Sequence, residues 1–286
     1  MPTTEVVNLG NAFGTDKETR IFAERYFRVQ HADLLFSDAA IFVEGTSERM
    51  LIPLFIERDF PVLRRKYISL LDIGGSHAHR LRPLVERLGI PTAVVTDLDP
   101  VIPRTTDKGR TVRAAVHIAG QADLECGNDT LTSWHPKLTN FQAFAAPGTA
   151  ELEWTSETGV KVRFAWQVPV VAASNQWPSS FEDSLVLSNI AWFKSLDKKV
   201  DPDTGVLARP RGALGRVVDT VVDHPQHDEL LEALHKLLRG SFSKGDFAAT
   251  MFENITNGEA VTCPPYIADA LAWLQAQLSP RTDEAP

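Results

Sequence analysis

The sequence predicts an α/β protein in which a parallel β-sheet is covered by helices on both faces. Three apolar segments between residues 39 and 100 alternate with segments of helical spacing. Their hydrophobic character is nearly continuous, as expected of strands that are buried on both sides. Glycines and carboxylates stand where these segments end, and open parallel sheets bind ligands at the carboxyl ends of their strands.

The predicted elements follow in chain order. They are a strand over 39–45, a helix over 47–60, a strand over 67–75, a helix over 78–89 and a strand over 91–100. Thr46 or Ser47 can cap the first helix, and Gly89 is placed to end the second. The second strand ends in Gly74 and Gly75, and the third ends in TDLD.

The rest of the chain is mainly helical by its spacing of apolar residues. Helices are expected over 179–196, 216–239, 244–255 and 265–278, strands over 111–118 and 160–171, and a helix or loop over 128–146. Residues 17–36 also have helical spacing. We therefore expect a connector helix in 1–36, a catalytic core in 37–182, a mainly helical insertion in 183–243, and a part, 244–286, that packs back on the core.

Composition indicates a globular protein without metal-binding cysteines. Of the 286 residues, 43% are hydrophobic and 23% charged, which is ordinary for a soluble domain. No apolar run approaches the roughly 20 residues of a membrane span, and the N-terminus lacks the pattern of a signal peptide. The two cysteines are far apart, which excludes a disulfide framework and a cysteine zinc site. We expect a cytoplasmic protein.

The charge is unevenly distributed along the chain. The net charge of -8 argues against binding nucleic acid by bulk charge. Residues 58–113, however, contain 11 Lys and Arg against 6 Asp and Glu, which leaves 18 against 31 elsewhere. This basic stretch is either a surface that attracts nucleic acid or a solvated helix face.

Two acidic motifs stand at predicted strand ends. In VEGTSE, Glu44 ends a strand and Glu48 lies in the first turn of the next helix, and in TDLD, Asp97 and Asp99 follow another strand. Crowded carboxylates are costly unless they are protonated or neutralised by a cation, and oxygen-only ligands favour Mg²⁺, Mn²⁺ or Ca²⁺ over Zn²⁺. Taken alone, the first motif also fits a helix N-terminus with favourable charge placement, and the second fits a turn.

Together, AIFVEGTSE and LDIGGSHAHRLRPLVERLGIPTAVVTDLD resemble a Toprim domain. The amino-acid sequence of these segments is similar to the nuclease half of the OLD (overcoming lysogenisation defect) family. Members of that family pair an N-terminal ABC-type ATPase with a C-terminal Toprim nuclease. SSFEDSLVLSN, FSKGDFAATMF and PPYIADALAWL extend the resemblance over roughly residues 30 to 280. The resemblance implies a divalent-metal-dependent DNA endonuclease that uses Mg²⁺ or Mn²⁺, with two ions about 4 Å apart; Ca²⁺ is also expected to bind.

The resemblance also implies roles for individual residues. The metal ligands it implies are Glu44, Glu48, Asp97, Asp99, Ser180 and Glu182. Lys244 matches a lysine near the scissile phosphate, and it is assigned to catalysis with Glu44 and Glu48. Gly74 and Gly75 match a turn where the absence of Cβ lets DNA or a ligand approach. Locally, Glu182 also fits simple helix capping, and Lys244 also fits a solvated loop.

Four further residues are expected around the site rather than in it. His77 and His79 are expected at the surface or behind the ligands, because an oxygen-rich site does not require imidazole. Asp72 and Asp107 are candidates for the surroundings of the metal ligands.

Other functions fit less well. A topoisomerase needs a tyrosine nucleophile on a separate module, and the three tyrosines, Tyr26, Tyr67 and Tyr266, lie in no evident helix-turn-helix. A primase usually carries a cysteine-rich zinc module, and this chain, with two cysteines far apart, has none. The remaining alternative is a non-catalytic Toprim module that binds nucleic acid or a protein partner.

The expected partners follow from the same resemblance. No GxxxxGK[ST] motif occurs, so no ATP site of the P-loop type is expected in this chain. The resemblance implies an ABC-type ATPase domain in a full-length protein, of which this is the C-terminal region or a short form without the ATPase. DNA is the expected substrate, no membrane is involved, and the isolated chain is expected to be monomeric.

Overall fold

The structure of the chain is a computed structural model. It describes residues 21, 32–105, 109, 111–116, 123–169, 177–200, 205 and 209–279. Most of the expected connector helix over 17–36 lies outside these residues, as do Tyr26 and Asp107; within them, Ala32–Phe36 forms a short 3-10 helix, η2. None of the described helices is long and apolar enough to cross a membrane.

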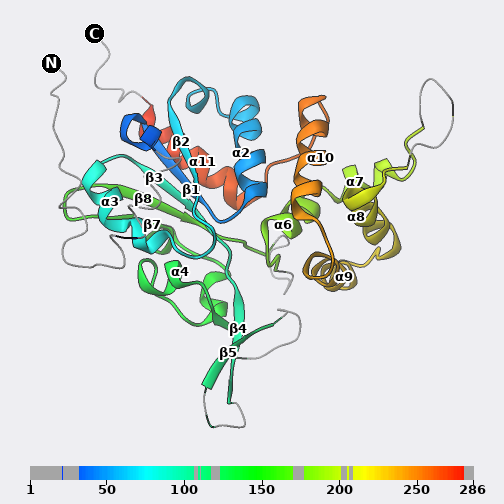
Figure 1. Cartoon of the computed structure of the whole chain (residues 1–286), viewed down its shortest axis with the longest axis horizontal. Coiled ribbons are helices and arrows are strands. Elements are labelled where there is room, and N and C mark those ends of the chain that lie inside the picture. The colour runs from blue at the N-terminus through cyan, green and yellow to red at the C-terminus, as the bar shows by residue number, and fades with distance from the viewer. Residues whose placement is uncertain are drawn as a thin grey trace.

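A five-stranded sheet forms the centre of the protein. Its strands are β1 (Ala39–Val43), β2 (Ile68–Asp72), β3 (Thr92–Val95), β7 (Glu153–Thr155) and β8 (Lys161–Ala165). Their spatial order is β2-β1-β3-β8-β7 (Figure 1). The first four in this order are parallel, and β7 pairs antiparallel with β8 at the edge. The expected parallel sheet is therefore confirmed, and its three apolar strands are neighbours of one another or of β8.

Alternation along β1 separates two hydrophobic cores, because successive side chains of a strand point to opposite faces. Ile41 and Val43 pack into a core with α2 (Thr46–Asp59) and α11 (Pro265–Leu278). Ala40 and Phe42 pack into a second core with α3 (Arg82–Leu88) and η4 (Ala78–Leu81). Gly89 ends α3, as predicted, and its φ of 72° is in the left-handed region that favours glycine. Helices thus cover both faces of the sheet, as expected.

A group of helices stands beside the sheet and joins the first core. It comprises α6 (Phe181–Leu187), α7 (Ile190–Leu196), α8 (Gly212–Asp223), α9 (His227–Arg239) and α10 (Lys244–Thr256). The helix expected over 216–239 is interrupted after Asp223 because Pro225 has no N–H for a helical hydrogen bond. The boundary expected between residues 182 and 183 falls inside α6, and α10 contacts both α2 and α8.

A second, smaller sheet was only partly expected. The strand β4 (Pro100–Thr105) pairs antiparallel with β5 (Thr111–Ala115) on one side and with β6 (Glu125–Cys126) on the other. The β4–β5 hairpin extends away from the body of the protein (Figure 1). Residues 128–146 form short helices, α4 (Asp129–Ser133) and η5 (Phe141–Phe144), separated by loops. The remaining short helices are η3 (Leu63–Arg65) and α5 (Thr149–Leu152).

Candidate active site

Acidic side chains from three parts of the chain meet at the carboxyl ends of the strands. Glu44 directly follows β1, Asp97 lies two residues after β3, and Glu48 lies in the first turn of α2. With Glu182 of α6 and Lys244 of α10, they line a cleft of about 340 Å³. We call it the acidic cleft; its lining comprises Glu44, Gly45, Thr46, Ser47, Glu48, Asp97, Glu182, Lys244 and Gly245.

Glu44 is held directly against the second acidic motif. Its Oε1 accepts hydrogen bonds from the Thr96 hydroxyl, from the backbone N–H of Asp97 at 3.2 Å and from the side-chain amide of Asn128 at 2.8 Å. The two motifs, 53 residues apart, therefore converge at one point, as the sequence predicts.

Asn128 connects these groups from a fully buried position. Besides Glu44, its amide nitrogen lies 2.8 Å from the Thr96 hydroxyl and 2.7 Å from the carbonyl oxygen of Asp97. Its own carbonyl oxygen accepts from the N–H groups of Thr130 and Leu131 and so caps α4. One amide thereby fixes the geometry of both acidic motifs.

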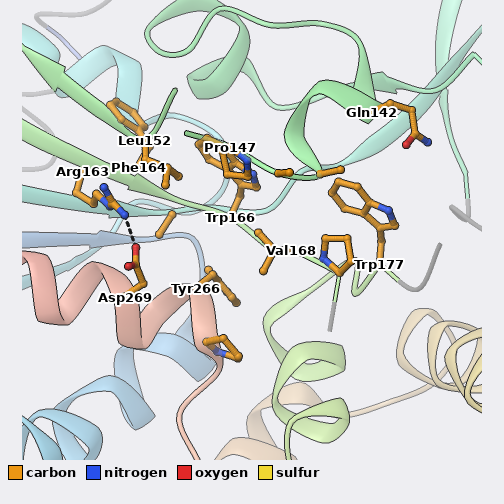
Figure 2. Close-up of a pocket in the computed structure, with 15 residues that line it drawn as sticks. Gln142, Pro147, Leu152, Arg163, Phe164, Trp166, Val168, Trp177, Tyr266 and Asp269 are labelled. Carbon is orange, nitrogen blue, oxygen red and sulfur yellow. Dashed lines mark hydrogen bonds and ion pairs between the residues drawn. The ribbon is translucent and has the colours of Figure 1, made fainter. Parts of the chain in front are cut away.

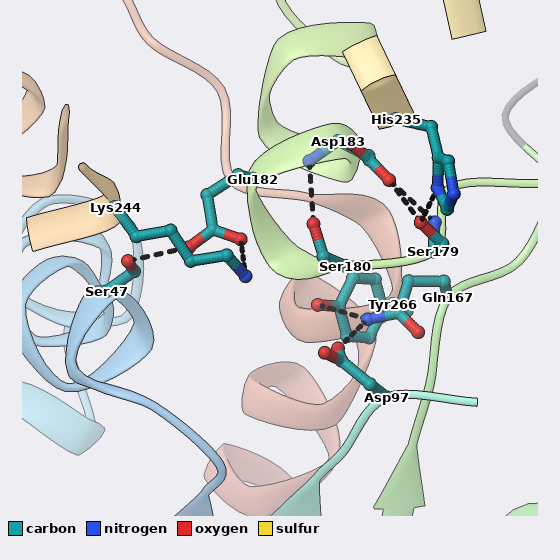
Figure 3. A network of polar contacts seen from close by, with 10 residues as sticks. All are labelled: Ser47, Asp97, Gln167, Ser179, Ser180, Glu182, Asp183, His235, Lys244 and Tyr266. Carbon is teal, nitrogen blue, oxygen red and sulfur yellow. Dashed lines mark hydrogen bonds and ion pairs between the residues drawn. The ribbon is translucent and has the colours of Figure 1, made fainter. Parts of the chain in front are cut away.

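Asp97 is held by a residue that follows β8, the strand next to β3. The amide of Gln167, just after β8, donates to Asp97 Oδ1, and the same nitrogen lies 3.4 Å from the Tyr266 hydroxyl of α11 (Figure 3). The Gln167 carbonyl oxygen accepts from the N–H of Leu98 at 3.2 Å. Gln167 is fully buried, so Asp97 sits in a polar network with little freedom to turn.

Glu182 of α6 contacts side chains of two other helices, α2 and α10. Its Oε1 accepts from the Ser47 hydroxyl at 2.8 Å, and its Oε2 forms an ion pair with Lys244 Nζ at 2.8 Å (Figure 3). The side chain of Glu182 is only 3% exposed. The expected capping role of Ser47 or Thr46 is wrong: Gly45 is the N-cap of α2, and the Ser47 hydroxyl is free to bind Glu182.

The remaining predicted site residues lie around the cleft and are not among the residues that line it. Ser180 is the N-cap of α6, where its hydroxyl accepts from the N–H of Asp183 at 3.3 Å. Asp99 has a φ of 48°, an uncommon conformation for a residue with a side chain. Gly74 and Gly75 have φ values of 63° and 105°, which favour glycine, and nothing lies within 4 Å of where a Cβ would stand.

The residues expected in the surroundings also lie near this rim. Gly75 donates its N–H to the carbonyl oxygen of Glu44 at 3.2 Å, and Asp72 accepts from the N–H of Gly74 at 3.0 Å. The His79 Nδ1 lies 3.1 Å from the carbonyl oxygen of Ser76, and burial lowers the pKa of His79. His77 precedes the 3-10 helix η4.

Crowding and burial keep protons on the acidic groups. Burial, opposed by hydrogen bonds and reinforced by the charge of Asp99, raises the pKa of Glu44 from 4.5 to about 7. Burial and the charge of Glu182 raise the pKa of Glu48 from 4.5 to about 8. Burial and the charge of Glu44 also raise the pKa of Asp97 well above its ordinary value. Without a cation, the cleft therefore holds protonated carboxyl groups near neutral pH.

Lys244 supplies positive charge to the same cleft. Burial lowers the pKa of its ammonium group, but the charge of Glu182 and the hydrogen bond to it outweigh burial, and the pKa is raised. The charge of Lys244 in turn lowers the pKa of Glu48 and of Asp97, against the larger effect of burial. Arg239 and Lys244 act in the same direction on Asp99, whose pKa burial raises.

The donor set fits a hard divalent cation, although no ready-made ligand shell is present. The acidic groups of the cleft offer carboxylate oxygens. The pKa values of Glu44, Glu48 and Asp97 are raised by burial and by neighbouring negative charge, and a cation would neutralise that charge. Within the described part of the chain, no three acidic, histidine or cysteine side chains are grouped closely enough to hold a metal as they stand. A cation would have to draw the carboxylates together.

A larger cavity of about 600 Å³ is lined in part by Tyr266, whose hydroxyl lies 3.4 Å from the amide nitrogen of Gln167. Figure 2 shows its mostly apolar lining, which includes Phe164, Trp166 and Trp177. Its acidic lining residue, Asp269, is already paired with Arg163. Because it offers apolar surface and one neutralised carboxylate, this cavity is a weaker candidate for metal or phosphate chemistry.

Neutral residues of the site were missed by the sequence analysis. Asn128 opens the motif NDTLTS, which indicates a helix cap but not a contact with residue 44. Gln167 is a polar residue in the apolar segment FAWQVPVV, and this is the one local signal of a buried polar network. Thr96 and Tyr266 carry no signal of their own, because their contacts depend on strands and helices far away in the sequence.

Part of the chain matches a known protein family, and a longer part is similar to a named endonuclease. Residues 35–99 match the family described as overcoming lysogenization defect protein-like, TOPRIM domain. Endonuclease GajA of Bacillus cereus (strain HuB5-5) is 25% identical over 263 residues, which cover 90% of this chain and 34% of GajA. The chain thus spans about a third of the length of this relative.

Solved structures of the C-terminal regions of OLD proteins are also similar to this chain. The C-terminal region of the Burkholderia pseudomallei OLD protein is 22% identical, with a TM-score of 0.41, over 85% of this chain and 100% of that one. The C-terminal region of the Xanthomonas campestris pv. campestris OLD protein is 19% identical, with a TM-score of 0.39, over 85% and 96%. The family match contains Glu44, Glu48, Asp97 and Asp99, whereas Glu182 and Lys244 lie outside it. Residues 35–99 therefore match a Toprim domain of the OLD-like type, and the resemblance inferred from the motifs is confirmed.

Proposed function

We propose that this chain is an endonuclease that cleaves phosphodiester bonds of DNA with the help of divalent cations. The observation that carries the proposal is the convergence of Glu44, Glu48, Asp97 and Glu182 on one cleft that also contains Lys244. The similarity to a protein named as an endonuclease supports it.

Two of the carboxyl groups, those of Glu44 and Asp97, are each oriented through one oxygen. Asn128 and Thr96 contact Oε1 of Glu44, and Gln167 contacts Oδ1 of Asp97, so the second oxygen of each group remains as a ligand. The proposed ligand set is Glu44, Glu48, Asp97, Asp99, Ser180 and Glu182, for two Mg²⁺ or Mn²⁺ ions. When bound, such ions supply an acidified water molecule and positive charge beside the phosphate.

Lys244 acts on the phosphate itself in this proposal. Its ammonium group now neutralises Glu182, so it already stands where positive charge is needed. An incoming phosphate offers it a second anionic partner. Lys244 then stabilises the negative charge on the oxygens of the pentacoordinate phosphate. Glu44 and Glu48 complete the catalytic set because they flank the same cleft.

A plasmid nicking assay tests the proposal. Purified protein is incubated with supercoiled plasmid in Mg²⁺, in Mn²⁺ and in EDTA, together with the variant Asp97→Asn. The matched control is Glu57→Gln on the exposed side of α2. We expect nicking in Mg²⁺ or Mn²⁺ by the wild type and by the control, and none in EDTA or by Asp97→Asn. Nicking by Asp97→Asn at the wild-type rate would place the chemistry elsewhere.

A non-catalytic nucleic-acid or partner-binding module is the alternative function. The ion pair between Lys244 and Glu182 favours it, because both groups are already satisfied without metal or substrate. Under this alternative, the protein binds DNA with no nicking above the EDTA control even at high protein concentration.

We further propose that an ABC-type ATPase domain in a longer protein delivers DNA to this site, since the chain spans only part of its relative. The isolated chain should then be monomeric and bind DNA weakly. Its affinity should fall steeply with salt, as expected of contacts to phosphates.

A further inference from the structure

The β4–β5 hairpin is rooted in the residues that form the acidic cleft. β4 begins at Pro100, directly after Asp99, and β6 pairs back on Pro100 and Val101. The N–H of Gly127, which follows β6, donates to the carbonyl oxygen of Asp99 at 2.8 Å. The next residue is Asn128, which holds Glu44. The hairpin is therefore fixed at its base to the groups that carry the proposed chemistry.

Beyond its base, the hairpin has no core of its own. Val101 is buried, but Pro103, Arg104 and Thr105 are exposed, and Val112 on the opposite strand is 43% exposed. A six-residue strand spans about 20 Å, and an isolated pair of strands is only marginally stable in water. An exposed ribbon of this length that projects from the site (Figure 1) is suited to contact something outside the protein.

The charge of the ribbon indicates an anionic partner. Its two strands contain Arg104 and Arg113 and no acidic residue, in a chain of net charge -8. Arg104 pairs with Val112 and Arg113 with Pro103, so the two arginines project from opposite faces of the ribbon. Arg113 lies 3.8 Å from Glu125, a long and exposed ion pair that water screens. The connecting residues Asp107, Lys108 and Arg110 lie outside the described part of the chain and carry none of this argument.

We propose that the β4–β5 hairpin is a DNA-binding arm that holds a duplex beside the acidic cleft. The choice of DNA as the polyanion rests on the proposed nuclease function. A two-stranded ribbon fits a groove of duplex DNA, and arginines on both of its faces can reach phosphates of both strands. Arg104 and Arg113 belong to the basic stretch over 58–113, and the arm gives this part of the stretch a function that the acidic cleft does not.

Charge reversal on the arm tests the proposal. The double variant R104E/R113E is compared with R64E/R65E, which makes the same change of charge in η3, ahead of the amino end of β2 and so away from the cleft. The affinity of each for a short fluorescein-labelled duplex is measured by anisotropy in EDTA over a range of salt. We expect R104E/R113E to bind about 10- to 100-fold more weakly at roughly 0.1 M salt, with a salt slope reduced by about 2. R64E/R65E should bind like the wild type.

Equal losses in both double variants would show that only bulk charge matters and would overturn the proposal, as would wild-type affinity in R104E/R113E. The melting temperature of each variant is measured in parallel. R104Q/R113Q replaces the glutamate variant if the latter unfolds, and it should lose affinity in the same direction.

The nicking assay separates this proposal from the nuclease function. Wild-type protein that binds the duplex through the arm but does not nick in Mg²⁺ or Mn²⁺ would overturn the nuclease and support the arm. Normal nicking with unchanged affinity in R104E/R113E would overturn the arm and leave the nuclease standing. A wild-type dimer that R104E/R113E converts to a monomer, with no duplex binding, would make the hairpin a self-association surface and overturn the proposal.

Discussion

Neutral side chains hold the acidic groups of the cleft in place. Asn128 donates to Glu44, Gln167 to Asp97, and Ser47 to Glu182. Because these donors carry no formal charge, they orient the carboxyl groups without cancelling the negative potential that attracts a cation. We regard Asn128 and Gln167 as positioning residues rather than ligands.

Glu48→Gln should stabilise the metal-free protein at alkaline pH. The pKa of Glu48 is 4.5 ordinarily and about 8 in the folded protein. Between these values the folded form keeps a proton that the unfolded form has lost, so stability falls as pH rises through this range. Glutamine does not ionise, so the variant does not lose folding stability in this way as pH rises. We expect a gain on the order of 1–3 kcal/mol in the free energy of unfolding at pH above about 8, and little change near pH 4.5, measured by urea denaturation in EDTA.

Glu57→Gln is the matched control for this prediction. Glu57 lies on the same helix with a mostly exposed side chain, and it forms a long ion pair with Arg64. The control should leave the pH dependence of stability unchanged. A Glu48→Gln protein with the wild-type pH profile would mean that Glu48 is already ionised without metal.

Lys244→Ala should slow cleavage without weakening metal binding. Removal of the ammonium group takes away a partner of the proposed phosphate and costs about 10²- to 10³-fold in the single-turnover rate. It also removes a cation that now neutralises Glu182, so Mn²⁺ affinity, measured by calorimetry, should stay the same or rise. Lys236→Ala, an exposed lysine of α9, is the control. Substantial loss of Mn²⁺ binding by Lys244→Ala would assign Lys244 a different role.

At the scale of elements, burial decides what the sequence can predict. The strands β1, β2 and β3 were predictable because they form one apolar sheet, and Gly89 ended α3 as expected. β4 was missed because half of its residues are exposed and two are prolines, so neither alternation nor an apolar run marks it. The break between α8 and α9 follows from Pro225, which the apolar periodicity of the segment concealed.

The site was predictable only where its acidic residues belong to short sequence motifs. Glu44 and Asp97 could be placed together because both stand at strand ends of one parallel sheet, and such ends meet at one rim. The contact between Ser47 and Glu182 spans 135 residues and depends on how α6 packs against α2. No periodicity or spacing encodes such a packing arrangement.

Gly127→Ala should disturb the junction between the two sheets. A Cβ at this position would lie 2.6 Å from the carbonyl oxygen of Asp99 and 2.8 Å from Cγ1 of Val101, too close for either to remain in place. We expect a loss of about 1–3 kcal/mol in stability and a reduced nicking rate, because Asp99 must shift. Thermal unfolding measures the stability, and the plasmid assay measures the nicking rate. A variant with wild-type stability and rate would show that the junction accommodates the methyl group without cost.

At the scale of the whole molecule, the cleft joins segments that are 200 residues apart. Glu44 and Asp97 come from the sheet, Glu182 and Lys244 from helices of the first core, and Asn128 from the region beside the second core. Because both cores support the same rim, cation binding should be coupled to the stability of the entire fold.

Mn²⁺ should therefore raise the melting temperature, and more so at high pH. Protons compete with the cation for Glu44 and Glu48, whose pKa values are about 7 and about 8. At pH above about 8 the carboxylates are free to bind, and a free Mn²⁺ concentration about 100 times Kd adds about 2.7 kcal/mol. Near pH 6 this stabilisation should largely vanish. Differential scanning fluorimetry with Mn²⁺ titrations at both pH values measures it, with Asp97→Asn as control; equal stabilisation at both pH values would argue against binding by these carboxylates.

Lys244 and Tyr266 are translated after the acidic residues of the cleft, so the complete site can assemble only after both have been made. When the ribosome has translated the chain as far as residue 200 of this sequence, the nascent polypeptide already contains Glu44, Asp97 and Glu182. It still lacks α10 and α11, which supply Lys244 and the hydroxyl that contacts Gln167. A polypeptide that ended before α10 would carry these acidic residues without the ammonium group of Lys244 and without the Tyr266 hydroxyl.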